Sequence, residues 1–89
     1  MADNSSQSWK HINFAAQVDE KLQLSTSVDV SYELRPMGIS PTYKGDLNAG
    51  ASLVLDLGDS GPWDLRVKAR NGMDVRFSNT ESPPVIRLF

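Results

Sequence analysis

The sequence predicts an all-β domain, a small antiparallel β-sandwich or partly open barrel of six to seven short strands. Polar and apolar side chains alternate with a period of two along much of the chain, which gives each strand one apolar and one wet face. Clusters of Gly, Pro, Asn, Asp and Ser separate these segments. No ten-residue segment has a convincing apolar repeat at helical spacing. The length of 89 residues fits one domain, and the absence of cysteine excludes disulfides and thiolate chemistry.

The N-terminal half contains two alternating segments. Residues 11–14 predict a short first strand, and residues 19–21 form the turn after it. The alternation then runs over residues 22–34, which is long for one strand, so the small residues 25–27 predict a bend or break. Residues 36–41, with two prolines and a glycine, end this part of the sheet.

The C-terminal half repeats the same pattern of strand and turn. Gly45-Asp46, residues 48–50 and the loop 58–62 are turn signals. Four further strands are expected over residues 51–57, 63–69, 73–77 and 84–89. The inward phase of the strands predicts a core that contains Leu24, Val30, Leu53, Leu55, Leu65, Val67, Val75 and Phe77.

Asn71-Gly72 predicts a hairpin turn between residues 63–69 and 73–77. A two-residue turn would place charged side chains opposite apolar ones, so we expect a three-residue loop, 70–72, with Gly72 in the left-handed region. This register pairs Ala69 with Met73, Val67 with Val75, and Leu65 with Phe77.

The charge distribution suggests a binding surface on this hairpin. The net charge of −2 divides into −5 for residues 1–64 and +3 for residues 65–89. The register above places Arg66 opposite Arg76, and it gives the hairpin an outward basic face of Arg66, Lys68, Arg70 and Arg76. An anionic protein partner would suit this face, with contributions from Trp9 and Arg87. The alternative is a solvated face with salt bridges to Asp64, Asp74 or Glu33. Nucleic acid is disfavoured, because the chain is acidic and no aromatic residue interleaves with the basic ones.

The sequence offers few candidates for catalytic or metal-binding residues. Gly58-Asp59-Ser60-Gly61 matches a short string around a protease serine, but His11 is the only histidine and the residues are ordinary for a loop. His11 is out of phase with its apolar neighbours and should face solvent or a strand edge. Asp56, Asp59 and Asp64 could hold a hard cation, but their spacing does not match the helix-loop-helix calcium pattern, and solvated loop acids are the favoured explanation. We therefore expect no catalytic residues, no cofactor and no metal.

The chain ends predict further properties. Residues 85–89 are apolar on both faces, which suits a central or covered strand, while Pro83-Pro84 favours an edge and thus a homodimer through the C-terminal strand. Residues 1–8 are polar and predict a flexible segment before a domain of residues 9–89. Neither a signal-peptide pattern nor a membrane span is visible, so we expect a cytoplasmic chain, or an exported one if a signal peptide has been removed.

Residues 47–79 carry a recurring pattern. Leu47-Asn48-Ala49-Gly50-Ala51-Ser52 precedes an apolar strand, a Gly-rich loop, Asp64-Leu65-Arg66-Val67 and a strand with Arg76-Phe77-Ser78-Asn79. This pattern resembles a group of small bacterial β-sandwich proteins of uncharacterised function. The resemblance implies a fold and no activity. Members tend to be exported and to have cysteines near the Gly-rich loop, whereas this sequence has no cysteine and shows no signal-peptide pattern.

These observations favour a non-catalytic protein-interaction or assembly module that binds through its basic hairpin face and last strand. One alternative is a small phage or mobile-element inhibitor of a host enzyme. Another is a sandwich that binds carbohydrate or a small ligand with Trp9, Tyr32 or Tyr43.

Overall fold

The computed structural model describes residues 9–36, 42–58, 61–80 and 83–89. In this part of the chain the predicted all-β class is confirmed, with eight strands instead of six to seven and no helix. The strands are β1 (Lys10–Ala16), β2 (Lys21–Thr26), β3 (Val30–Pro36), β4 (Tyr43–Leu47), β5 (Ser52–Asp56), β6 (Gly61–Ala69), β7 (Phe77–Thr80) and β8 (Val85–Leu88).

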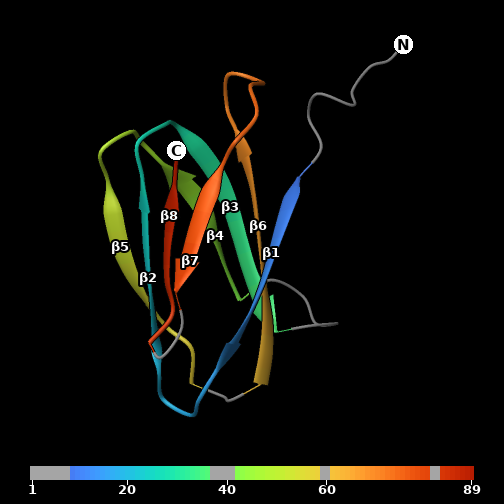
Figure 1. Cartoon of the computed structure of the whole chain (residues 1–89), viewed down its shortest axis with the longest axis vertical. Coiled ribbons are helices and arrows are strands. Elements are labelled where there is room, and N and C mark those ends of the chain that lie inside the picture. Colours follow the sequence, from blue (N-terminus) through green and yellow to red (C-terminus); the bar gives the residue numbers. More distant parts are fainter. Residues whose placement is uncertain (1–8, 37–41, 59–60, 81–82) are drawn as a thin grey trace.

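The strands form two four-stranded sheets that pack as a β-sandwich (Figure 1). Sheet A has the order β1-β6-β3-β4, and sheet B has the order β5-β2-β8-β7. All neighbours are antiparallel except β2 and β8, which run parallel. Most connections cross from one sheet to the other, so the two halves of the core come from interleaved parts of the sequence.

The core lies between the sheets and uses the inward phase of nearly every strand. Six of the eight predicted core residues are buried: Leu24, Val30, Leu55, Leu65, Val67 and Val75. Leu53 is half-buried. Phe77 is 39% exposed, contrary to prediction, because it lies on the edge strand β7, which has a neighbouring strand, β8, on one side only.

The break predicted near residues 25–27 is confirmed, at residues 27–29. The chain leaves sheet B at the end of β2 and enters sheet A as β3. The buried Thr26 hydroxyl stabilises this crossing, since its Oγ1 accepts a bond from the Val28 amide at 3.1 Å. The Ser27 amide donates to the carbonyl of Leu88 at 2.9 Å and ties the crossing to β8.

The turn predicted at Gly45-Asp46 is wrong, because both residues lie within β4. Gly45 is opposite Tyr32 of β3, and a Cβ atom at Gly45 would lie 3.4 Å from the Tyr32 hydroxyl. The absent side chain leaves space for the tyrosine ring at the sheet edge. The turn at 48–50 is confirmed, with Gly50 at a φ of 87°. Two other predicted turns are only partly described. Residues 37–41 of the turn at 36–41 and residues 59–60 of the loop 58–62 lie outside the described residues.

The predicted hairpin between residues 63–69 and 73–77 is also wrong. β6 has β1 on one side and β3 on the other, so neither edge is open to residues 73–77. Residues 73–76 form no strand, and β7 pairs with β8 in the other sheet. The three predicted pairs, Ala69 with Met73, Val67 with Val75 and Leu65 with Phe77, therefore do not form. Gly72 does adopt a left-handed φ of 81°, as predicted.

The last strand is central, not an edge. β8 lies between β2 and β7. The prolines that favoured an edge precede the strand, where a missing N–H removes no ladder bond. Pro84 is buried and its carbonyl accepts a bond from the Gln23 amide at 3.1 Å. A homodimer cannot form by pairing along β8 while β8 has neighbours on both sides.

Candidate binding surface

The outer faces of the two sheets are the candidate surfaces, because each sheet turns its other face to the core. The outer face of sheet A is polar and mostly charged. The strand register arranges it in three rows: Lys68, Ser31 and Asp46; His11, Arg66, Glu33 and Lys44; and Asn13, Asp64 and Arg35.

Arg66 lies at the centre of this face and is held by a carboxylate and an aromatic ring. Its Nε donates to Glu33 Oε1 at 2.8 Å, and the two side chains form an ion pair. The Arg66 guanidinium carbon and the Lys68 Nζ each lie 4.7 Å from the centroid of the Trp9 ring, which is cation–π range. Arg66 and Lys68, two of the predicted binding residues, thus already have contacts within the chain. The ion pair between Arg66 and Glu33 is one of those expected for a solvated, salt-bridged face.

Asp64 is a buried carboxylate in the same face, with a side chain only 5% exposed. His11 Nδ1 lies 3.1 Å from each of its oxygens, and Arg35 Nε lies 3.4 Å from Oδ2. His11 itself is half exposed at the sheet edge, as predicted. In the described part of the chain no hydroxyl hydrogen-bonds to this imidazole, and Ser60 lies outside the described residues.

Arg70 links the chain segments at one end of sheet A. Its Nη2 donates to the Leu47 carbonyl at 3.2 Å and to Asn48 Oδ1 at 2.5 Å, and it lies 3.7 Å from Asp29 Oδ1. The Arg70 amide also donates to the Asp29 carbonyl at 3.0 Å. These bonds join the ends of three strands of sheet A and give this cation a structural role.

The outer face of sheet B is mostly small and uncharged. Its side chains include Gln23, Ser25, Ser52, Val54, Ser78, Thr80 and Val85. Lys21 and Asp56 pair with each other at one end. Arg76 and Arg87 are exposed on this face, and among the described residues neither has an acidic partner. They are diagonal neighbours, because Ser78 is opposite Arg87 and the Arg76 backbone pairs with that of Phe89.

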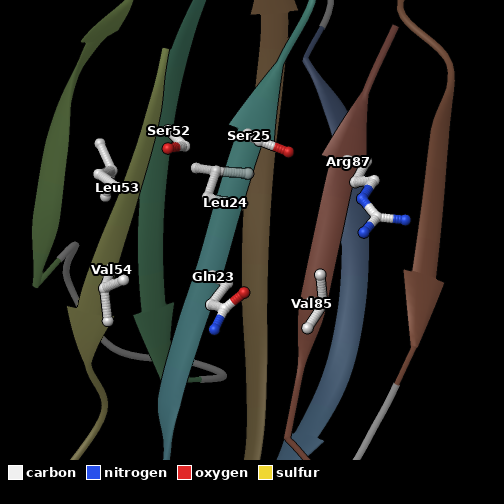
Figure 2. Close-up of a pocket in the computed structure, with 8 residues that line it drawn as sticks. All are labelled: Gln23, Leu24, Ser25, Ser52, Leu53, Val54, Val85 and Arg87. Atoms are coloured by element: carbon white, nitrogen blue, oxygen red, sulfur yellow. The ribbon is translucent and has the colours of Figure 1, made fainter.

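A shallow depression of about 160 Å³ lies on this face between β5, β2 and β8 (Figure 2). Gln23, Leu24, Ser25, Ser52, Leu53, Val54, Val85 and Arg87 line it. A wider hollow of about 760 Å³ continues over the end of the sheet and shares Ser25, Ser52 and Arg87 with the first. Val54 is 57% exposed here. Sequence reasoning missed it, although an apolar residue in the outward phase of a strand was an available signal.

The predicted binding residues therefore fall in three places. Trp9, Arg66 and Lys68 lie together on sheet A, Arg70 closes its loop, and Arg76 and Arg87 lie on sheet B. The expected pairing of Arg66 with Arg76 is wrong, since Arg66 is opposite His11 and Glu33. No aromatic residue interleaves with the basic residues along β6, but Trp9, which precedes β1, contacts Arg66 and Lys68 in the folded chain.

The three aromatic residues considered for carbohydrate binding do not share a surface. Trp9 lies on the outer face of sheet A, and Tyr32 is buried in the core. Tyr43 lies at the sheet edge, where its hydroxyl donates to the Asp56 carbonyl at 2.7 Å.

The three aspartates considered for a cation site are not brought together either. Asp56 pairs with Lys21 on sheet B, whereas Asp64 lies under His11 and Arg35 on sheet A. Asp59 lies outside the described residues. Across residues 9–36, 42–58, 61–80 and 83–89, no group of three or more His, Asp or Glu side chains could hold a metal ion.

Comparison with family models, curated proteins and solved structures finds no match to this chain. The resemblance of residues 47–79 to small bacterial β-sandwich proteins thus rests on the sequence pattern alone. In the described residues no helix is long and apolar enough to cross a membrane.

Proposed function

We propose that this protein is a non-catalytic interaction module that binds an acidic partner protein through the outer face of sheet B. The observation that carries the proposal is the pair Arg76 and Arg87, two exposed cations without an acidic neighbour among the described residues, on a face that is otherwise nearly uncharged. Arg87 also lines both hollows of this face. Arginine suits such a role, because its planar guanidinium binds carboxylates through two parallel hydrogen bonds.

The contrast with sheet A supports this choice of face. There Arg66 has Glu33, Arg35 has Asp64, and the ring of Trp9 covers Lys68. Among the described residues of that face, Lys44 on the edge strand β4 is the exposed cation with neither kind of contact. A partner at that face would have to displace these contacts, and the gain would be small because one ion pair would replace another. On sheet B an incoming carboxylate meets Arg76 and Arg87, two neighbouring cations that have no acidic partner in the described part of the chain.

A protein fits better than a nucleic acid as the anionic partner. The chain has a net charge of −2, and affinity for nucleic acid depends on neutralising many phosphates. The face of sheet B offers two arginines that have no acidic partner among the described residues, and it also carries apolar Val54 and small hydroxyl side chains. Such a mixture suits a protein surface that presents a few carboxylates within an apolar patch.

The test compares two charge reversals on opposite faces. Arg87→Glu and Lys44→Glu each remove one exposed cation, the first on sheet B and the second on β4 of sheet A. The wild-type chain and both variants are used as baits in cells that express the protein, and retained proteins are quantified by mass spectrometry. We expect acidic proteins that wild type and Lys44→Glu retain equally and that Arg87→Glu loses. Equal retention by all three baits would contradict the proposal.

A further inference from the structure

The free edge of β7 has backbone groups available for another strand. The Arg76 and Phe89 backbones exchange two hydrogen bonds, of 2.7 and 2.9 Å. Because bonded and non-bonded pairs alternate along an antiparallel ladder, Phe77 and Asn79 occupy non-bonded positions opposite Leu88 and Ile86. Their N–H and C=O groups therefore point away from β8. In the described part of the chain no strand pairs with that side of β7.

Two inward-phase side chains of β7 are also incompletely satisfied, one in its burial and one in its hydrogen bonding. Phe77 lies in the inward phase but is 39% exposed. The Oδ1 atom of Asn79 is buried and has no hydrogen-bond partner among the described residues. A buried amide oxygen without a donor is costly, so this position would gain from a group that supplies one.

The other edge strands have protection that β7 lacks. β1 carries the inward-phase Lys10, whose Nζ lies 3.5 Å from Asp74. β4 carries Lys44 and Asp46, and the last carbonyl of β5 accepts a bond from the Tyr43 hydroxyl. Charged side chains and covered backbone groups are the usual means by which edges avoid pairing. From Phe77 to Thr80 no residue of β7 is charged.

We infer that the partner of the proposed function binds as an extended acidic segment that adds a strand to sheet B along β7. Its residue opposite Ser78 would face outward, diagonal to Arg76 on β7 and across β7 from the long side chain of Arg87, and is therefore Asp or Glu. Its residue opposite Phe77 faces inward and is apolar. Its residue opposite Asn79 also faces inward and carries a hydroxyl or amide that donates to the buried Oδ1.

The direct test uses amide hydrogen exchange in the full chain, measured by NMR. The probe is the acetylated and amidated peptide Val-Asp-Ser-Glu-Val-Asp, and the control peptide has Lys in place of each Asp and Glu. At about 90% occupancy the Phe77 and Asn79 amides should exchange about tenfold more slowly, because they are open only in the free tenth of the molecules. The lysine peptide should leave them unchanged. Protection that rises with protein concentration without peptide would instead indicate pairing with a second copy, and it would overturn the assignment.

Variants separate the binding mode from the proposed function, on which it rests. Asn79→Pro removes the outward N–H without removing a bond to β8, whereas Asn79→Ala keeps that N–H. We expect Asn79→Pro, which loses both the N–H and the Oδ1 acceptor, to weaken peptide binding at least tenfold, and Asn79→Ala, which loses only the Oδ1 acceptor, to weaken it clearly less. If the peptide binds and is lost in Arg87→Glu, but the Phe77 and Asn79 amides stay unprotected, the strand-addition mode is wrong and the acidic-partner function stands. If the acidic and lysine peptides bind equally or not at all, both are wrong. The exchange measurement on wild type decides the case even if Asn79→Pro fails to fold.

Discussion

The carboxylate of Asp64 joins two strands that are distant in sequence. Its partner His11 lies 53 positions earlier in the chain, and Arg35 approaches from the opposite neighbouring strand. Asp64 is buried because these two longer side chains cover it on the outer face of sheet A. Its alternation phase marked it as an outward residue, which is right, but phase alone carries no information about what covers an outward residue.

Replacing Asp64 with Asn tests the energetic role of this cluster. The substitution keeps the shape but removes the charge that compensates Arg35, so we expect the free energy of unfolding to fall by about 2–3 kcal/mol. This value lies below the roughly 3–5 kcal/mol typical of a fully buried pair, because the His11 side chain is half exposed. Urea unfolding followed by circular dichroism measures it. Asp74→Asn is the matched control, since Asp74 is 83% exposed and should cost less than about 1 kcal/mol. Equal losses in the two variants would refute a special role for Asp64.

Tyr32 gives the protein an alkaline sensitivity. Burial raises the pKa of its hydroxyl above the ordinary 10.0, and the charge of Asp46 raises it further. The folded chain keeps this proton where the unfolded chain has lost it, so the free energy of unfolding falls as the pH rises through about 10. The hydrogen bond to Asp56 raises the pKa of Lys21 above 10.5 and acts in the same direction. We expect Tyr32→Phe to lose stability less steeply from about pH 9 to about pH 11. Parallel curves for wild type and Tyr32→Phe would contradict this.

At the scale of elements, the alternation predicted which side of each strand faces the core but not which strands are neighbours. The inward residues of β6 are buried as expected, yet its neighbours come from far away in the sequence, at β1 and β3. Asn71-Gly72 correctly indicated a turn, but a local turn signal does not determine whether the chain returns to the same sheet. That choice depends on which edges distant strands already occupy. The candidate site shared this weakness, because its basic face was derived from the assumed hairpin.

The difference in burial between β6 and the segment after it can be tested with two side-chain truncations to alanine. Leu65 is fully buried between Ile12 and Leu34, so Leu65→Ala should cost about 2–4 kcal/mol. Met73 is 69% exposed, and Met73→Ala should change stability by less than about 0.5 kcal/mol. In the hairpin that the sequence suggested, Met73 would have faced the core opposite Ala69. A large loss of stability for Met73→Ala, measured by thermal or urea unfolding, would instead support that hairpin.

At the scale of the whole molecule, the two ends of the chain contribute to different sheets. β1 forms an edge of sheet A, whereas β8 lies inside sheet B and is paired with β2 and β7. The parallel pair β2–β8 joins residues separated by most of the chain, and such contacts can form only after almost all of it is available. The sequence did not predict this arrangement, because apolar character on both faces suited a central strand and the prolines suited an edge.

The central position of β8 predicts that the two ends of the chain respond differently to deletion. Removing residues 85–89 takes out β8, leaves β7 without a neighbour and exposes one side of β2, so the remaining chain should lose its cooperative unfolding transition. Removing residues 1–8 leaves Trp9 and every strand of both sheets in place, and the polar sequence of those residues predicts an unchanged melting temperature. Circular dichroism melting curves of the two shortened chains measure both effects. A cooperative transition without residues 85–89 would mean that sheet B can form without its third strand, whereas a large loss of stability without residues 1–8 would place those residues within the domain.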